Sequence, residues 1–269
     1  MTDLPPAICF AKVSKVFGGV KALQDVAFEV GQGEVHCLAG ENGCGKSTLI
    51  KIITGVYQPE AGAEMALFGE GLAAITPNLA RQRGIAVIWQ DLALFPEMTV
   101  AENIAFESLL GNRPRRVDHR ALRAAAEAAL ARLEVSLDLD ARLGTLPIAA
   151  RQVVAIARAL VSDARLIFMD EPTASLTQAE TDALLAVVRT LSARGVAVVF
   201  VSHRLAEVLE ISSRVTVLRD GRLVGVYPTE GMTQARLTEL MTGKTLDHQV
   251  RARDTSGDPP VLELSLIHI

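Results

Sequence analysis

The chain lacks the features that mark secreted, membrane-spanning and nucleic-acid-binding proteins. Its three cysteines, among 269 residues, form neither a disulfide framework nor a metal-ligand spacing. No uncharged apolar run approaches the roughly 20 residues that a helix needs to cross a bilayer. The N-terminus, MTDLPPAICF, has no secretory-signal pattern. With 27 basic and 31 acidic residues, the net charge of −4 creates no basic field. We therefore expect no signal peptide, no transmembrane segment and no nucleic-acid partner.

The chain does contain enough apolar sequence for a large core. Hydrophobic residues make up 49% of it and charged residues 22%, which excludes global disorder. Short apolar runs alternate with stretches of helical periodicity. The predicted strands are 7–10, 27–30, 35–39, 85–89, 166–169, 196–202, 215–219 and 223–227. The predicted helices are 47–53, 100–110, 118–133, 151–162, 178–194 and 204–210.

The order of these elements predicts an α/β fold. Apolar strands separated by helices are typical of a parallel sheet that is covered on both faces. Gly18-Gly19 and Asp220-Gly221 are typical of tight turns between antiparallel strands. We expect a mostly parallel sheet with helices on both faces, an antiparallel β portion at the N-terminus and an inserted α-helical subdomain at 91–162. Residues 244–260 lack periodicity and are predicted to form a linker.

A glycine-rich loop predicts nucleotide binding. Residues 40–47 read GENGCGKS and fit the pattern G-x-x-x-x-G-K-[ST] between a predicted strand and a predicted helix, which indicates a P-loop NTPase core. In this pattern backbone N–H groups surround the phosphates, Lys46 reaches the β- and γ-phosphates, and the Ser47 hydroxyl ligates Mg²⁺. The predicted ATP-binding residues here are Gly40, Asn42, Gly43, Cys44, Gly45, Lys46, Ser47 and Thr48.

A second element ends an apolar strand in two carboxylates. Residues 166–172 read LIFMDEP. At such a strand end, Asp170 is positioned to bind Mg²⁺ and Glu171 to polarise an attacking water. The alternative for this pair, an ordinary solvated strand end, is disfavoured by the phosphate loop upstream.

Together these motifs resemble the ATP-binding subunits of ABC transporters, over about residues 7–243. The resemblance implies that Phe17 stacks on adenine, although a phenylalanine in the core is the alternative. It further implies that Gln90 contacts Mg²⁺ or water and couples to a membrane partner. By the same resemblance, the segment Ala174-Ser175-Leu176 is the D-loop. His203, after the apolar run 196–202, would contact the γ-phosphate.

The family signature Leu-Ser-Gly-Gly-Gln is altered in this chain. The corresponding residues are Leu146, Pro147, Ile148, Ala149 and Ala150. In the family this segment completes the ATP site of the opposite ATPase domain. Proline has neither a hydroxyl nor an N–H to offer, and alanine adds a Cβ where glycine permits close approach. We expect this chain to hold ATP in its own loop but to complete its partner's site poorly. The alternative is that both changes are tolerated.

Several segments are similar to the carbohydrate-uptake branch of that family, which includes ribose, galactose and xylose importers. They are FGGVKAL, GENGCGKSTLIKIITGVYQPEAG, PTASLT and VSHRLAEV. In this branch two ATPase domains are commonly fused in one chain, and the second often carries an altered phosphate loop. The resemblance therefore implies one competent site, at Lys46, and one degenerate site.

The C-terminal residues suggest that the chain is a fragment. Residues 259–264, PPVLEL, resemble the first strand of a second domain. Residues 264–269, LSLIHI, match the translation of CTG-TCT-CTT-ATA-CAC-ATC, a transposon end that is used in the preparation of DNA libraries. We interpret 264–269 as a sequencing-adapter artefact; a genuine hydrophobic tail is the alternative. The predicted domains are 1–243 (core 1–90 and 163–243, helical subdomain 91–162), the linker 244–260 and a truncated second domain 261–269.

The resulting hypothesis is an ATPase motor that drives import of a sugar or sugar alcohol, with ATP and Mg²⁺ as its cofactors. Its expected partners are a second ATPase domain, a membrane permease and, indirectly, a periplasmic solute-binding protein. The expected location is the cytoplasmic face of the inner membrane. Two alternatives remain: a soluble ABC ATPase without transport, which the −4 charge disfavours, and a nucleotide-dependent binding module with little hydrolysis, which Pro147 favours.

Overall fold

The computed structural model describes residues 4–106 and 118–244. Its strands are β1 (Ile8–Phe17), β2 (Val20–Val30), β3 (Val35–Ala39), β4 (Glu64–Leu67), β5 (Glu70–Leu72), β6 (Ile85–Ile88), β7 (Leu166–Asp170), β8 (Ala197–Val201), β9 (Arg214–Arg219) and β10 (Arg222–Pro228). Its helices are α1 (Lys46–Ile53), α2 (Pro77–Gln82), α3 (Val100–Ile104), α5 (His119–Leu133), α6 (Ile148–Val161), α7 (Gln178–Ala193), α8 (Leu205–Ile211) and α9 (Gln234–Thr242), with a 3-10 turn at Leu143–Thr145.

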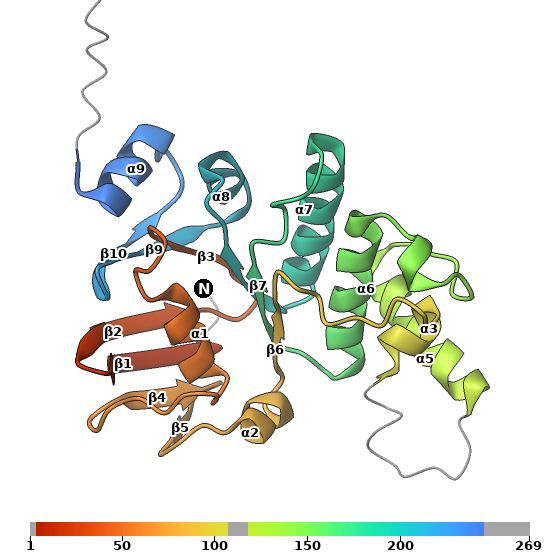
Figure 1. Ribbon diagram of the computed structural model, residues 1–269, viewed down its shortest axis with the longest axis horizontal. Helices are drawn as coiled ribbons and strands as arrows, with labels where there is room; N and C mark the ends of the chain where they lie inside the picture. The colour runs from red at the N-terminus through yellow and green to blue at the C-terminus, as the bar shows by residue number, and fades with distance from the viewer. Residues whose placement is uncertain (1–3, 107–117, 245–269) are drawn as a thin grey trace, which may run out of the picture.

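A six-stranded sheet in the order β10-β9-β3-β8-β7-β6 forms the centre of the fold. Its strands run parallel except for β10, which pairs antiparallel with β9. Every residue of β3 and of β8 is buried, as expected for strands covered on both faces. Helix α1 and the four-stranded antiparallel sheet β2-β1-β4-β5 lie on one face, while α6 and α7 pack on the other (Figure 1). The predicted α/β fold is confirmed.

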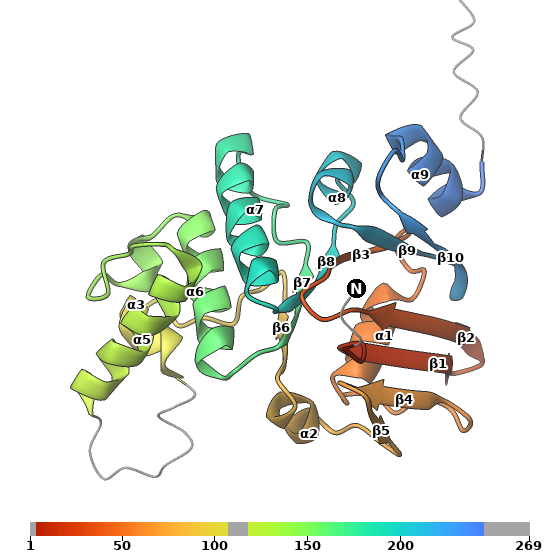
Figure 2. The same cartoon turned by 180° about the vertical axis from the view of Figure 1, so that it is seen from behind.

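The helical insertion follows β6 and precedes β7 in the chain. Helices α3, α5 and α6 pack together at one end of the molecule (Figure 2), around side chains such as Ile104, Leu130 and Val154. A capping box between Thr99 and Glu102 starts α3, and Asp118 caps α5. In the described part of the predicted helix 100–110, α3 ends at Ile104, Ala105 forms a turn and Phe106 is again helical. The described residues do not include 107–110 of that predicted helix, 245–260 of the predicted linker 244–260, or the predicted second domain 261–269.

Both predicted tight turns are present. Gly18 and Gly19 have positive φ between β1 and β2, and so do Asp220 and Gly221 between β9 and β10. The strands β1 and β2 are much longer than the predicted strands 7–10 and 27–30, because bulges interrupt the alternation of apolar and polar residues on which the prediction relied. The sequence patterns did not predict β4, β5, α2 and α9. β4, β5 and α2 are short, with 4, 3 and 6 residues. β4 is held by pairing with β1, and α9 by packing on β9.

A buried polar network joins the start of β3 to β9. Arg214 donates two hydrogen bonds to Glu34, at 2.8 and 2.7 Å. The fully buried His36 contacts Glu34 through Nδ1 at 2.8 Å and Thr216 Oγ1 through Nε2 at 2.7 Å. Burial raises the pKa of the Glu34 carboxyl, but hydrogen bonds from Arg214, His36 and the Gly31 amide outweigh this effect and hold the pKa at about 2.

This network predicts a pH-dependent contribution to stability. A carboxylate whose pKa is lowered stabilises the fold above its ordinary pKa of 4.5, and the contribution is lost as the pH falls through about 2. Between about pH 5 and pH 2, the free energy of unfolding should fall on the order of 3 kcal/mol more for the wild type than for Glu34→Gln. Urea unfolding followed by circular dichroism at several pH values measures this difference, and parallel pH curves would contradict the prediction.

Candidate nucleotide-binding site

The phosphate loop connects β3 directly to α1. Gly45 precedes the helix with φ of 106°, and Gly40 leaves the strand with φ of 154°, both outside the range that side chains favour. A Cβ on Gly40 would lie 2.5 Å from Cys44 Sγ and closer still to the Leu218 carbonyl oxygen. Glycine is therefore required at position 40 because the loop passes against the backbone of β9.

The loop residues border a pocket of about 270 Å³. Lys46 Nζ, at the start of α1, donates to the carbonyl oxygens of Gly40 at 2.7 Å and Glu41 at 3.0 Å. The pocket is lined by Ala22, Asn42, Gly43, Gly45, Lys46, Ser47, Thr48, Gln90, Asp170 and Glu171. These residues include the predicted ligands from the loop, from the end of β7 and from the segment after β6. They come together although Asn42 and Glu171 are 129 positions apart in the sequence.

Two carboxylates enter this pocket from the end of β7. Glu171 has a positive φ of 48°, and its amide donates to the Val201 carbonyl at 2.8 Å, so the chain turns sharply after the strand. Burial and the neighbouring Glu171 raise the pKa of the Asp170 carboxyl, while Lys46 lowers it. The half-buried carboxylates, the Ser47 hydroxyl and the Gln90 amide form a set of oxygen donors of the kind that Mg²⁺ prefers.

His203 reaches the same site from the end of β8. Its Nδ1 lies 3.2 Å from Glu171 Oε1, and 61% of its side chain is exposed. Strands β7 and β8 are parallel neighbours, so their carboxyl ends place Glu171 and His203 side by side.

Three of the predicted ATP-binding residues do not line the pocket. The Cys44 side chain is buried, and its amide donates to the Glu41 carbonyl at 3.2 Å; Gly40 lies against the Leu218 carbonyl of β9. Phe17 ends β1 on the surface, where its ring packs edge-on against Tyr57 at 5.1 Å between centroids. Phe17 is thus exposed rather than part of the core, and its stacking on adenine stays a prediction.

The altered signature lies at the start of α6. Pro147 is the N-cap residue and makes no side-chain capping bond, while Ile148 is 44% exposed. The Arg151 guanidinium donates to the carbonyls of Leu146 at 2.9 Å and Gly144 at 3.0 Å, and so holds this segment. Ala149 and Ala150 lie in the first turn, half-buried and adding only methyl groups. Ile148 and Arg151 line a hollow of about 290 Å³ together with Gln90 and Ser175.

Sequence reasoning missed Gln152. Its side chain is buried in α6, and its Nε2 donates to the Pro172 carbonyl, next to Glu171, at 3.0 Å. Among the described residues, its Oε1 has no hydrogen-bond partner. An amide among the mostly apolar residues of α6 was the signal that could have found it.

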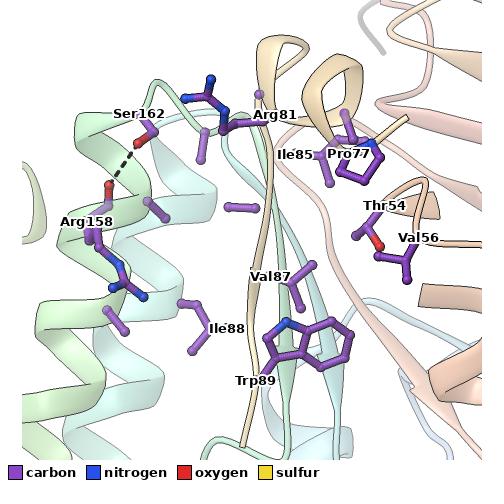
Figure 3. A pocket seen from close by; sticks show the side chains of 16 residues that line it. Thr54, Val56, Pro77, Arg81, Ile85, Val87, Ile88, Trp89, Arg158 and Ser162 are labelled. Carbon is purple, nitrogen blue, oxygen red and sulfur yellow. Dashed lines mark hydrogen bonds between the residues drawn. The ribbon is translucent and has the colours of Figure 1, made fainter. Parts of the chain in front are cut away.

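A separate groove runs along the outer side of the edge strand β6 (Figure 3), with a volume of about 270 Å³. Pro77 and Arg81 of α2 border one end, while Arg158 of α6 and Ser162, which directly follows α6, border one side. Trp89, which immediately precedes Gln90, lies at the other end (Figure 3). Because Gln90 lines the nucleotide pocket, two consecutive residues of the chain connect the groove to that pocket.

Comparison with known proteins shows the family of the chain. The family model described as "ABC transporter" matches residues 23–174, more than half of the chain. The chain belongs to the ABC transporter family. The ADP conformation of MJ1267, an ATP-binding cassette of an ABC transporter, superposes with a TM-score of 0.78 at 26% identity, covering 89% of this chain and all of that one. The resemblance inferred from the motifs is thereby confirmed.

The curated relatives of this ABC protein indicate which branch of the family it is similar to. The chain is 50% identical over 250 residues to a ribose import ATP-binding protein RbsA of Streptomyces avermitilis, covering 91% of this chain and 48% of that protein. It is 43% identical over 247 residues to a putative ribose/galactose/methyl galactoside import ATP-binding protein of Agrobacterium fabrum, with coverage of 91% and 48%. The chain spans about half the length of these relatives. Across the parts of the chain that the structure describes, no helix has both the length and the hydropathy needed to cross a membrane.

The phosphate loop predicts unequal effects of adding a methyl group at two glycines. Gly40→Ala places a Cβ against backbone and should lower the free energy of unfolding by about 2–4 kcal/mol. Gly43 has a φ of 83° but no atom within 4 Å of the added Cβ, so Gly43→Ala should cost only about 1 kcal/mol of backbone strain. Urea unfolding compares the two variants, and equal losses would contradict the steric argument.

Proposed function

We propose that this chain is the ATP-binding and ATP-hydrolysing motor of an ABC importer for a sugar or sugar alcohol. The observation that carries the proposal is the convergence of the phosphate loop, Gln90, Asp170 and Glu171 on one pocket, with His203 beside Glu171. Sugar import rests on the ribose and galactose import proteins among the relatives. The intact residues at the pocket fit hydrolysis better than a module that only binds nucleotide.

The chemistry follows from the positions of these groups. The amides of the loop and of the first turn of α1 bind phosphate oxygens, and Lys46 exchanges its bonds to loop carbonyls for bonds to the β- and γ-phosphates. Glu171 accepts a hydrogen bond from the attacking water and orients it in line with the bond to be broken. His203 donates to the γ-phosphate oxygens, where negative charge must be stabilised as that bond breaks.

Mg²⁺ fits this site because of its donors. Ser47, Gln90 and Asp170 would hold the ion, and the raised pKa of Asp170 reflects its burial and the neighbouring Glu171 carboxylate, which the charge of Lys46 offsets only in part. When bound, the ion supplies positive charge that neutralises the phosphates of ATP. The chain's own contribution is to orient the nucleotide and the water.

The altered signature supports two unequal ATP sites. We propose residues 1–243 as one ATPase domain, with core 1–90 and 163–243, joined by a linker at 244–260 to a second ATPase domain that begins near 261. The relatives of about twice this length support that arrangement. Pro147 and Ala149 would face the second domain's phosphate loop, where Pro147 has no donor for phosphate. The site at Lys46 would then carry out the turnover.

The expected membrane partner is a permease, with a periplasmic solute-binding protein acting through it, at the cytoplasmic face of the inner membrane. The groove along β6 is a suitable contact, since it combines apolar side chains with Arg81 and Arg158 at its border. Trp89 lines the groove and Gln90 lines the nucleotide pocket. A partner that displaces Trp89 on binding the groove would therefore also displace Gln90 in the ATP site.

Removal of the Glu171 carboxylate should separate binding from hydrolysis. In the full-length protein, Glu171→Gln is expected to reduce kcat for ATP at least about 100-fold, because the water loses its acceptor, while ATP still binds. Phosphate release and fluorescent-nucleotide binding measure the two effects, and Glu230→Gln, at an exposed position, is the control. Normal turnover by Glu171→Gln would contradict the assignment of Glu171.

The two-site asymmetry makes a further prediction. Lys46→Ala in the full-length protein should remove nearly all ATP turnover, because the remaining site faces a signature that lacks its donors. Two equivalent sites would instead leave a substantial part of the rate. Steady-state phosphate release decides between these outcomes, and unchanged turnover would exclude the model.

A further inference from the structure

A buried carboxylate lies on α8, four residues after His203 in the chain. Glu207 on α8 is 6% exposed, and its Oε2 accepts a hydrogen bond from Thr173 Oγ1 at 2.5 Å. Its Oε1 accepts from Arg204 Nη1 at 3.0 Å. None of these three residues lines the nucleotide pocket. A buried charge is costly unless it is paired and hydrogen-bonded, so this arrangement holds its partners in defined positions.

The partners of Glu207 come from two different loops. Thr173 lies two residues after Glu171, whereas Arg204 directly follows His203. Arg204 also donates through Nη2 to the Ala174 carbonyl at 3.3 Å and through its backbone N–H to Ser202 Oγ at 3.0 Å. The loop after β7 and the loop after β8 are therefore cross-linked through side chains that do not line the nucleotide pocket.

This cross-link bears on the geometry of catalysis. Because the His203 side chain is largely exposed, its position beside Glu171 depends on how the backbones of the two loops are held. A displacement of about 1 Å between groups that act on the same transition state can reduce the rate on the order of 100-fold. The bonds of Glu207 are placed to limit such a displacement.

We propose that Thr173, Arg204 and Glu207 form a positioning clamp that keeps Glu171 and His203 in register for ATP hydrolysis. The inference rests on the proposed ATPase function and names residues that act through the catalytic pair without touching ATP. The clamp also includes the Ala174 carbonyl, so it links the geometry of the pair to the segment Ala174-Ser175-Leu176.

The test uses the full-length protein and a nearly isosteric change. Thr173→Val removes the hydroxyl that donates to Glu207, and kcat for ATP should fall about tenfold or more while the Kd for a fluorescent ATP analogue changes less than about twofold. Thr173→Ser retains the hydroxyl and should restore kcat. The matched control is Thr181→Val, at a buried threonine on α7 whose hydroxyl has no hydrogen-bond partner among the described residues.

Arg204→Lys is a second test. Lysine keeps the positive charge but lacks the two guanidinium nitrogens with which Arg204 bonds Glu207 and the Ala174 carbonyl at the same time. This variant tests the clamp if Thr173→Val does not fold. Unchanged kcat in the folded variants, beside an active wild type, would overturn the clamp. The clamp would also be overturned if Thr173→Val lowered Tm, ATP binding and kcat together and Thr173→Ser did not restore them, because that pattern indicates a purely structural role. An inactive full-length wild type would instead refute the proposed function itself.

Discussion

The parallel alignment of β3, β7 and β8 is the constraint on which the site depends. Their carboxyl ends lie at one edge of the sheet, so the phosphate loop, Glu171 and His203 meet there although they are far apart in sequence. The pairing in turn depends on burial, because strands that are apolar on both faces are stable only between covering layers. Helices α6 and α7 on one side and α1 with the antiparallel sheet on the other provide those layers.

Charge is distributed unevenly around this edge. Two adjacent carboxylates face one lysine, and burial raises the pKa of Asp170. Lys46 is held by the carbonyls of its own loop rather than by either carboxylate. Such an arrangement favours a ligand that brings both anionic phosphates for the lysine and a cation for the carboxylates. A nucleotide with its divalent ion has that composition, which connects the electrostatics of the site to its family membership.

Much of the site was predictable from local sequence, because its residues occupy fixed positions in short motifs. The loop pattern required strand, glycines, lysine and helix in order, and the structure has that order. Residues that act across the fold were not predictable. Gln152, Arg151 and Glu207 look like ordinary helix residues until packing places them against Pro172, Gly144 and Thr173. The same holds for β4 and α9, whose local patterns are weak and whose partners are distant.

The sequence by itself determined the α/β class, the chemical groups available for nucleotide binding and the absence of phosphate donors at Pro147, because these follow from residue type and short-range order. Tertiary structure alone decided which groups meet. It placed Phe17 on the surface and His203 beside Glu171, and it built the Glu207 cross-link between two loops. The physical reason is that strand pairing and the burial of apolar faces are long-range interactions, whereas a motif records only its neighbours along the chain.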